Sequence, residues 1–484
     1  MRPERIGQEI QKLISGHVFW DKQSRDLYSV DASSYLVKPL IVVFPKNETD
    51  VITILKYATK NGISVTPRGA GTGLVGSALG NGIILDLRHF DKIRVGPNYV
   101  EAGSGVFKGN LDKVLEENGR FFGPNPSIGP YCTVGGMVAT NASGSHSLKY
   151  GGAIDNLLGV RIITSDGKIT QLPSNSQFAK SVFKVIRSNI KKRFPRVSKN
   201  SCGYRLDTVK EKSDLQKIIA GSEGTLGIII SAKLKTFPKP KKIMLIVLAY
   251  KTIRHAVADC AKIVNLKPSA LEIIDHNIIK HIKTKFTKSA NYLLFVEFDS
   301  NIVKSKERLQ KIITNAKIIK TLTRKDEVKK WWGFRNSALS YSIRSITAKE
   351  SMPTVIEDAT VPVRKLVSLV DIIGKVAKKY KIRYVLYGHA GNGNLHIRPI
   401  LKRKNKKLIK KIASEFFSQV IRIGGCITGE HGDGLARSEF VKMQYEKSVY
   451  STFDKIKNHF DPQHILNPGK IISKKSTIIE NLKI

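Results

Sequence analysis

Two short motifs bring together residue types that can bind a metal ion and move a proton. The first has His389 and His396 on either side of the turn Gly-Asn-Gly-Asn, and the second has Glu430 followed directly by His431. Two neutral imidazoles and one carboxylate suit a divalent ion such as zinc, manganese or iron, and they leave coordination positions open for a substrate. A single histidine beside a turn is more often a surface or packing residue. The combination nevertheless predicts a metal site at His389, His396 and Glu430.

A glycine-rich loop at residues 67–76 has the composition of a phosphate-binding loop. Residues 71–76 read G-T-G-L-V-G, which matches the dinucleotide pattern GxGxxG after a strand. That fingerprint also needs a helix at the third glycine, because the helix N-terminus holds the pyrophosphate. Only residues 77–82 separate the loop from the next predicted strand, so we exclude the Rossmann unit. The loop instead offers many backbone N–H groups and few side chains, and can wrap closely around an anionic pyrophosphate.

Further glycine-rich stretches favour a long, polar cofactor. Glycine is combined with small hydroxyl or amide residues at 123–127, 133–144, 150–151 and 221–227. Structural turns alone do not need so many consecutive small residues. Several such loops within one strand-rich segment predict a cofactor with more than one phosphate, threaded between the surrounding elements.

Alternating strands and helices are expected to position these loops. Apolar, β-branched runs predict strands, and helical spacing of apolar residues predicts helices. The strands are expected at residues 39–44, 63–66, 83–87, 160–164 and 228–237, and the helices at 51–61, 109–118 and 176–194.

A proline- and lysine-rich stretch at residues 237–242 predicts a domain boundary. Beyond it, runs at 243–250 and 291–299 predict strands and 255–266 predicts a helix, which indicates a second sheet with helices on one face. The two metal-site histidines then flank the turn of a predicted hairpin, so they can converge on one point.

Composition excludes several classes of protein. The chain has 484 residues, enough for two to four domains, and its hydrophobic fraction of 41% is typical of a globular protein. The four cysteines form no CxxC pair, which argues against iron–sulfur clusters, zinc ribbons and a disulfide framework. No apolar run approaches the roughly 20 residues that cross a bilayer. We therefore expect a cytoplasmic protein.

The net charge of +43 invites a nucleic-acid interpretation, because clustered cations release counterions from phosphates. However, the surplus is mostly lysine, is spread along the chain and does not alternate with aromatic residues. We therefore expect no nucleic-acid partner. The lysines are either a general property of the surface or a basic face for anionic lipid or an acidic protein.

The glycine motifs resemble the FAD-binding domain of the vanillyl-alcohol oxidase/para-cresol methylhydroxylase (PCMH) superfamily. Within it, the chain is similar to the branch that contains D-lactate, glycolate and D-2-hydroxyglutarate dehydrogenases. The resemblance implies an α+β chain in four parts: an N-terminal helical segment (1–34), a two-part PCMH-type FAD-binding domain (35–239), an α+β substrate domain with an antiparallel sheet and the metal site (240–439), and a C-terminal helical segment that packs back on the flavin domain (440–484).

The same resemblance implies which residues surround FAD. They are Pro67, Arg68, Gly69, Ala70, Gly71, Thr72, Gly73, Leu74, Pro124, Thr133, Gly135, Gly136, Asn141, Ser143, Gly144, Gly151, Glu223, Gly224, Ile228 and Asn467. Members with covalent flavin often carry histidine in the first glycine loop. Here Ala70 and Thr72 stand in that loop, so FAD is expected to be non-covalent, and His146 is the one residue that would upset this expectation.

The resemblance also implies the roles of the polar residues. Positions that match His389, His396 and Glu430 bind the ion in metal-dependent members, and the next residue, His431, is the expected general base for the substrate hydroxyl. Arg335 matches the carboxylate-binding arginine of the family, a role that suits its forked guanidinium. The 2-hydroxyglutarate members carry Asn two residues after the second histidine. This chain has Arg398 there, which puts the glutarate assignment in doubt and is consistent with a second anionic contact.

The implied function is FAD-dependent oxidation of a D-2-hydroxy acid, with D-lactate or glycolate favoured. The chain carries no cluster cysteines, so we expect a separate electron acceptor: an iron–sulfur subunit, an electron-transfer flavoprotein, a cytochrome or a quinone. Three alternatives stay open: a D-2-hydroxyglutarate dehydrogenase, a non-redox flavoenzyme like alkylglycerone-phosphate synthase, and a basic binder of membrane surfaces or nucleic acid on a flavoprotein scaffold. Peripheral association with the inner face of the membrane and a homodimer also stay open.

Overall fold

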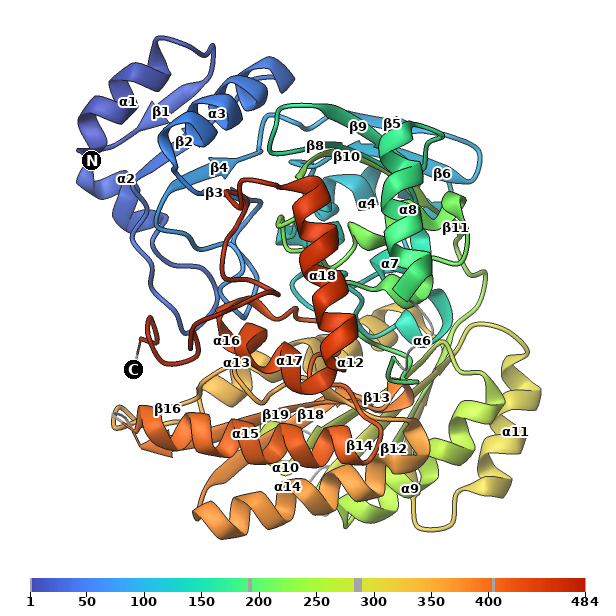
Figure 1. Cartoon of the computed structure of the whole chain (residues 1–484). Helices are drawn as coiled ribbons and strands as arrows, with labels where there is room; N and C mark the ends of the chain where they lie inside the picture. Colours follow the sequence, from blue (N-terminus) through green and yellow to red (C-terminus); the bar gives the residue numbers. More distant parts are fainter. Residues whose placement is uncertain (1, 190–193, 283–289, 403–404, 484) are drawn as a thin grey trace.

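The structure is a computed structural model that describes residues 2–189, 194–282, 290–402 and 405–483. Figure 1 shows the first half of the chain in the upper part of the molecule and a large sheet with its helices in the lower part. The last long helix, α18 (Lys447–Phe460), returns from the lower part across the upper one. Segments from both ends of the chain therefore meet in the upper part.

The first sheet contains four short strands. β2, β4 and β3 are parallel neighbours, and β1 pairs antiparallel with β2. Its strands and helices are β1 (His17–Phe19), β2 (Ile41–Phe44), β3 (Val65–Arg68), β4 (Ile83–Asp86), α1 (Pro3–Gln11), α2 (Lys22–Leu27) and α3 (Glu48–Asn61). The segment 1–34, which was expected to be helical, thus also supplies a strand. Between β3 and β4 the described residues form no helix, so the exclusion of a Rossmann unit is confirmed.

The second sheet is antiparallel, with the strand order β5-β6-β10-β8-β9. Its strands are β5 (Ile93–Val95), β6 (Tyr99–Gly103), β8 (Leu157–Ile163), β9 (Ile169–Leu172) and β10 (Ile228–Lys235), and a small pair joins β7 (Arg120–Phe121) to β11 (Phe237–Pro238). The α-helices of this region are α4 (Lys108–Glu117), α5 (Val134–Ala139), α6 (Ser147–Tyr150), α7 (Ala153–Asn156) and α8 (Gln177–Asn189). The predicted helix 176–194 is observed as α8 up to Asn189; residues 190–193 lie outside the described part, and residue 194 is not helical.

The third sheet is the large antiparallel one in the lower part of Figure 1. Its strands are β12 (Met244–Tyr250), β13 (Ala270–Asp275), β14 (Tyr292–Phe298), β15 (Lys317–Leu322), β16 (Glu350–Ser351), β17 (Ala359–Thr360), β18 (Arg383–His389) and β19 (Asn394–Lys402). The α-helices around it are α9 (Ile253–Ile263), α10 (His276–Ile279), α11 (Ile302–Ile312), α12 (Lys325–Asn336), α13 (Ala338–Ile343), α14 (Leu366–Tyr380) and α15 (Lys406–Arg422).

The prediction that helices cover one face of this sheet is wrong. Ile246 and Leu248 of β12 share a core with residues of α9, α14 and α15, whereas Leu245 and Val247 share one with Trp331 of α12 and its neighbours. Successive side chains of a strand point to opposite faces, so an almost wholly apolar strand needs apolar cover on both.

The predicted hairpin is confirmed. β18 ends at His389, the short 3-10 helix η7 (Ala390–Asn392) makes the turn, and β19 returns beside β18 with Tyr387 opposite His396. Gly393 has a left-handed φ of 69°, and a Cβ at that position would lie 1.9 Å from the carbonyl oxygen of Val361. The glycine is therefore required by both the turn and the packing against the neighbouring chain.

The C-terminal segment is only partly helical. After α16 (Gly434–Arg437), α17 (Val441–Gln444) and α18, residues 461–483 form turns and bends. The expected helix over 440–484 thus ends at Phe460, whose ring packs edge-on against Phe178 of α8. The remaining short 3-10 helices are η1 (Gly129–Tyr131), η2 (Leu206–Thr208), η3 (Lys212–Ile218), η4 (Val264–Leu266), η6 (Val363–Lys365) and η8 (Ser438–Phe440).

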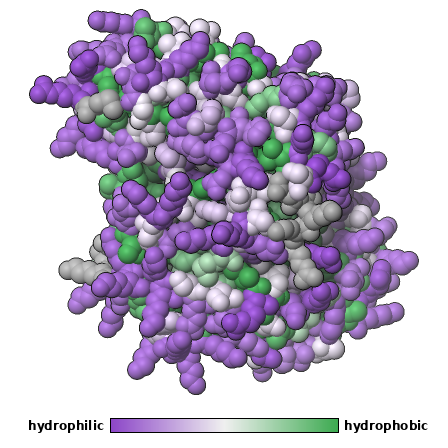
Figure 2. Space-filling view, in the orientation of Figure 1, coloured by the Kyte–Doolittle hydropathy of each residue, from purple (hydrophilic) through white to green (hydrophobic). Residues whose placement is uncertain are grey.

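The surface is hydrophilic over most of the face seen in Figure 2, with small apolar patches between the polar side chains. None of the helices in the described ranges combines the length and the apolar character that crossing a bilayer requires.

Lys457 of α18 is expected to stabilise the return of the chain to the upper part. Its buried Nζ donates to the carbonyl oxygens of Thr225 and Leu466, both at 2.7 Å, and to Asp461 Oδ2 at 2.5 Å. Lys457→Met leaves that carboxylate buried without its cation, so the free energy of unfolding should fall by about 3–5 kcal/mol. Urea unfolding measures the loss, with Lys455→Met on the exposed side of the same helix as control. Equal stability of the two variants would contradict the assignment.

Candidate functional site

A large cavity lies where the glycine-rich loops face the large sheet. Its lining comes from the β3–β4 loop, from residues 126–144 and 223–229, and from the hairpin β18–β19 with the loop that carries Glu430 and His431. The empty space amounts to about 1690 Å³ when the solvent at its mouth is included. The cavity thus runs from the glycine-rich loops to the histidine hairpin, so an elongated group bound in it can contact both.

Most residues predicted to contact FAD line this cavity. They are Pro67, Arg68, Gly69, Ala70, Gly71, Thr72, Gly73, Leu74, Thr133, Gly135, Gly136, Ser143, Gly144, Glu223 and Gly224. Five others are not among the lining residues: Pro124, Asn141, Gly151, Ile228 and Asn467. Asn467 lies behind the lining, where its Nδ2 donates to the carbonyl oxygens of Glu223 (2.6 Å) and Ser77 (2.8 Å).

The glycines of the cavity wall allow neighbouring loops to pack closely against one another. This packing supports a wall that can hold a cofactor. A Cβ on Gly69 would lie 2.1 Å from Thr133 Oγ1, and one on Gly224 would lie 2.3 Å from Pro67 Cγ. Larger residues would push these loops apart. The loops therefore present backbone, with its N–H groups, to whatever occupies the cavity.

His146, the residue that would upset the expectation of non-covalent FAD, is not among the cavity-lining residues. Its Nε2 lies 2.8 Å from Glu297 Oε1, and its ring lies against that of Trp332 at a centroid distance of 5.1 Å. The same glutamate also accepts hydrogen bonds from Ser269 and Trp332. His146 thus links the glycine-rich part of the chain to the large sheet.

Glu430 stands at the centre of the predicted metal site, with its two oxygens in different surroundings. Oε2 accepts from Ser143 Oγ (2.5 Å), the Gly144 N–H (3.0 Å) and Lys199 Nζ (2.7 Å). Oε1 lies 2.7 Å from His389 Nε2 and 3.3 Å from His396 Nε2. Although burial opposes ionisation, His389 and Lys199 hold the pKa of Glu430 well below its usual range, so it is a carboxylate.

Both histidines have an acceptor oxygen at Nδ1, and both turn Nε2 toward Glu430. His389 Nδ1 lies 2.8 Å from Glu272 Oε1, closer than the nearest guanidinium nitrogen of Arg335 at 3.4 Å, and His396 Nδ1 lies 3.3 Å from the Glu357 carbonyl oxygen. These oxygens only accept, so each Nδ1 carries a proton. Burial lowers the pKa of His396 to about 4, so its ring is neutral. Two imidazole Nε2 atoms and a carboxylate oxygen that converge in this way fit a divalent cation, which would take the place of the proton between His389 and Glu430.

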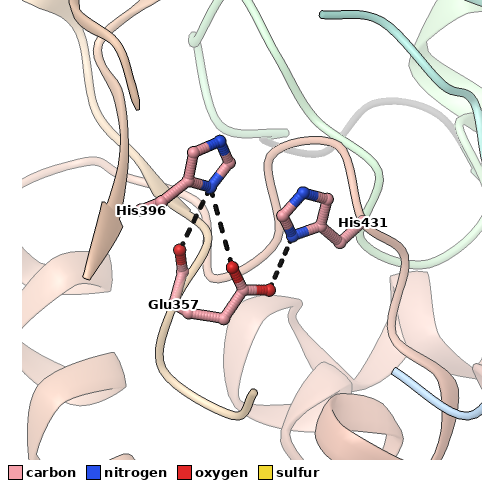
Figure 3. Close-up of side chains that lie close together, drawn as sticks. All are labelled: Glu357, His396 and His431. Carbon is pink, nitrogen blue, oxygen red and sulfur yellow. Dashed lines mark hydrogen bonds and ion pairs between the residues drawn. The ribbon is translucent and has the colours of Figure 1, made fainter. Parts of the chain in front are cut away.

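A second set of ligand-type side chains, Glu357, His396 and His431, lies next to the first (Figure 3). Arginine already occupies the surroundings of its carboxylate, because Nη2 of Arg437 lies 3.0 Å from Glu357 Oε1 and Nη2 of Arg398 lies 3.5 Å from Oε2. Two guanidinium groups at one carboxylate disfavour a dication there. The set around Glu430 therefore fits a metal better.

The two predicted substrate-binding arginines have different positions. Arg335 lines the cavity, and its Nε donates to Glu272 Oε2 at 2.7 Å while Nη1 lies 3.3 Å from Ser127 Oγ. Arg398 lies on β19, two residues after His396, is buried and is not among the lining residues. Its Nη2 lies 3.5 Å from Glu357 Oε2, but its Nε and Nη2 have no hydrogen-bond partner among the described residues, so the anionic contact suggested for Arg398 stays a prediction.

Several polar residues that organise the site were not identified from the sequence. Glu272 holds His389 and Arg335, and Lys199 holds Glu430. Asp358 Oδ2 accepts from three successive N–H groups, those of Gly429 (3.0 Å), Glu430 (3.0 Å) and His431 (2.8 Å), and so fixes the loop. Both Glu272 and the pair 357–358 stand inside apolar runs. An acidic residue within an apolar run is rarely buried without a partner. Its position in such a run is therefore the sequence signal that would have identified it as part of a polar site.

Comparison with known proteins identifies two domains. Residues 39–173 match the family model described as FAD binding domain, and residues 239–471 match that of the FAD linked oxidases, C-terminal domain. The glycolate oxidase subunit GlcD of Bacillus subtilis is 29% identical over 468 residues and covers 93% of each chain. The D-lactate dehydrogenase of Archaeoglobus fulgidus is 29% identical over 471 residues, or 93% of this chain and 96% of that one.

A third relative, the D-2-hydroxyglutarate dehydrogenase of Haemophilus influenzae, is 29% identical over 508 residues. These residues are 92% of this chain but 49% of the relative, so the chain spans about half the length of that protein. The predicted resemblance to this group of flavoproteins is confirmed.

The fold is shared with solved structures. An alkyldihydroxyacetonephosphate synthase aligns over 97% of this chain and 85% of its own, with a TM-score of 0.68 and 18% identity. The 6-hydroxy-D-nicotine oxidase of Arthrobacter nicotinovorans aligns over 95% and 98%, with a TM-score of 0.62 and 16% identity. The predicted fold class, an α+β chain with a PCMH-type FAD-binding domain, is confirmed.

Gly69→Ala tests the role of the glycine-rich wall. The added Cβ displaces Thr133, the N-cap of α5, and overpacking of this kind costs about 1–3 kcal/mol. The affinity for FAD should therefore fall by roughly 10–100-fold, as measured by flavin-fluorescence titration of the apoprotein. Gly374→Ala, in a helix with open space around that glycine, is the control and should bind FAD as the parent does. Unchanged affinity of the Gly69 variant would exclude close packing at this loop.

Proposed function

We propose that this chain, an oxidoreductase of the FAD-linked oxidase family, oxidises a small D-2-hydroxy acid to the 2-oxo acid. The observation that carries the proposal is that Glu430, His389 and His396 face the same cavity as the FAD-type glycine loops and Arg335. A 2-hydroxy acid has a hydroxyl that can bind at Glu430, His389 and His396 and a carboxylate that can bind Arg335. It also has a C2 hydrogen that can leave as hydride. The names of the relatives, glycolate oxidase subunit and D-lactate dehydrogenase, support this substrate class.

The cofactors supply two kinds of chemistry when they are bound. Non-covalent FAD, in the glycine-rich wall, provides the hydride acceptor, and a divalent ion at His389, His396 and Glu430 provides a Lewis acid that acidifies the hydroxyl. Two features of this chain's residues support the ion. The two Nε2 atoms and Glu430 Oε1 converge on one point, and Ser143, Gly144 and Lys199 hold the second oxygen of Glu430, so that Oε1 remains directed at the histidines.

His431 is the proposed general base. It lines the cavity next to Glu430, and its Nε2 lies 3.6 Å from Glu430 Oε1. It takes the hydroxyl proton as the C2 hydrogen leaves with its electron pair, so the substrate loses one proton and one hydride in forming the 2-oxo acid. General bases of this kind contribute about 10²–10⁴-fold to a rate.

Arg335 is the proposed partner of the substrate carboxylate. Its side chain is 1% exposed, and Glu272 fixes it through Nε and Nη2. Among the described residues, the cationic side chains that line the cavity are Arg68, on the glycine-loop side, and Arg335. Arg398 is not among the lining residues, so a second substrate carboxylate finds no second arginine beside Arg335 in the described wall of the cavity. This favours a monocarboxylate such as D-lactate or glycolate over D-2-hydroxyglutarate.

The proposed electron acceptor is a separate molecule: an iron–sulfur subunit, an electron-transfer flavoprotein, a cytochrome or a quinone. The four cysteines are all buried as free thiols, and the sequence has no CxxC pair to hold a cluster. A lysine-rich surface offers a means of docking an acidic partner, or of peripheral association with anionic lipid, and either attraction weakens with salt.

An anaerobic reduction screen tests the function. The FAD-loaded protein is mixed with D-lactate, L-lactate, glycolate, D-2-hydroxyglutarate and D-malate, and flavin absorbance is followed. Because Arg335 provides a site for one carboxylate, we expect fast bleaching by D-lactate or glycolate. The dicarboxylates should bleach the flavin at least tenfold more slowly, because a second carboxylate that stays unpaired on binding costs more than about 1.4 kcal/mol. Fastest bleaching by D-2-hydroxyglutarate would favour that alternative. No bleaching by any of the acids would overturn the proposal.

Metal removal tests the proposed ion. The purified protein should hold about one zinc, manganese or iron ion, measured by mass spectrometry, and chelation should slow flavin reduction by about 10²–10³-fold, because Lewis-acid stabilisation is worth several kcal/mol. Added metal should restore the rate. His396→Ala should lose the ion but keep FAD, whereas His459→Ala, at an exposed position of α18, should keep both. Full activity after exhaustive metal removal would show that the reaction needs no ion at this site.

A further inference from the structure

The structure assigns a role to Glu357: we propose that it positions His431, by holding Nδ1 so that the lone pair of Nε2 faces the substrate. The inference rests on the proposed function and adds a positioning residue to it. Glu357 Oε1 lies 2.6 Å from His431 Nδ1, and the two side chains point toward one another from separate segments of the chain (Figure 3).

The chemistry of this contact sets the tautomer of His431. A carboxylate oxygen accepts a hydrogen bond and has no proton to give, so Nδ1 must carry the proton. The lone pair is then on Nε2, the nitrogen that a general base uses. A histidine with the other tautomer would present an N–H to the substrate hydroxyl and could not take its proton.

Burial separates the roles of the two residues. The His431 side chain is 18% exposed and lines the cavity, whereas that of Glu357 is 0% exposed and is not among the lining residues. Glu357 therefore contacts no substrate, and its carboxylate can affect the reaction only through its neighbours, of which His431 is the nearest at 2.6 Å. The His431 ring also stacks on that of His396, with a centroid distance of 4.8 Å and an interplanar angle of 9°. Stacking fixes the plane of the ring, and the carboxylate fixes its rotation within that plane.

Other contacts hold Glu357 in place. Nη2 of Arg437 lies 3.0 Å from Oε1, and the neighbouring Asp358 accepts the His431 N–H at 2.8 Å and pairs with Nη1 of Arg437 at 3.1 Å. The backbone and the ring of His431 are thus fixed by two adjacent carboxylates that share one arginine. This double attachment is more than packing of the loop requires, because Asp358 alone already satisfies three of its N–H groups.

Glu357→Gln tests the role of the carboxylate. Glutamine keeps the size of the side chain but can turn its NH₂ toward Nδ1, which stabilises the wrong tautomer. Anaerobic flavin reduction at saturating acid should slow by about 10²–10⁴-fold, the range expected for loss of a general base. FAD content, metal content and the substrate concentration that gives half-saturation should stay within threefold of the parent.

Asp275→Asn is the matched control. Asp275 is also a buried carboxylate of the large sheet, and it accepts the Leu386 N–H at 2.9 Å and the Asn277 N–H at 3.0 Å. It is not among the residues that line the cavity. Its loss should leave the reduction rate within a few-fold of the parent, so a rate loss in Glu357→Gln alone is not a general effect of removing a buried charge.

A double variant distinguishes positioning from an independent role. His431→Asn should retain FAD and lose reduction, and Glu357→Gln added to it should slow the reaction no further, since the carboxylate acts through the histidine. Losses that multiply, or a Glu357→Gln rate equal to that of the parent, would overturn this inference while leaving the proposed function intact. A parent protein that no acid reduces would overturn the proposed function itself. If the Gln variant does not fold, Glu357→Asp, which keeps the charge but shortens the reach, is judged by the same criteria.

Discussion

One buried carboxylate, that of Glu430, ties the two halves of the molecule together. Its Oε2 is held by Ser143, Gly144 and Lys199 from the glycine-rich half, and its Oε1 faces two histidines from the hairpin of the large sheet. A buried charge is costly unless every oxygen has a partner. The position of the hairpin relative to the glycine loops is therefore set by the need to satisfy this group, and the same need brings a metal-type site to the wall of the cavity.

The large sheet supplies residues that hold the side chains of the site in place. Glu272 lies on β13, which pairs with β18, and so it reaches both His389 at the end of β18 and Arg335 on α12. Because both faces of the sheet are covered by helices, the Glu272 carboxylate stays out of water and its hydrogen bonds fix the orientations of His389 and Arg335. Arg335 and His389 thus share the carboxylate of Glu272, so a shift of one side chain changes the hydrogen bond of the other.

The sequence predicted the parts of the site that carry a local pattern. The hairpin around His389 and His396, the glycine loops and the absence of a Rossmann helix all follow from spacing within a few residues. The partners Glu272, Glu357 and Lys199 lie far along the chain from the groups they hold, and no local spacing predicts such contacts. The prediction of helices on one face was wrong because β12 is apolar on both faces, and the ion pair of Arg398 with Glu357 joins residues that lie far apart in the chain. In both cases tertiary contacts decided what the local sequence left open.

The most direct test of the account is the position of a metal in crystals of the FAD-loaded protein grown with manganese or zinc. Anomalous diffraction should give one peak about 2.0–2.2 Å from Glu430 Oε1, His389 Nε2 and His396 Nε2. That result would confirm that Glu430 joins a metal site to the flavin cavity. A peak between Glu357, His396 and His431, or no peak at these histidines at saturating metal, would contradict it.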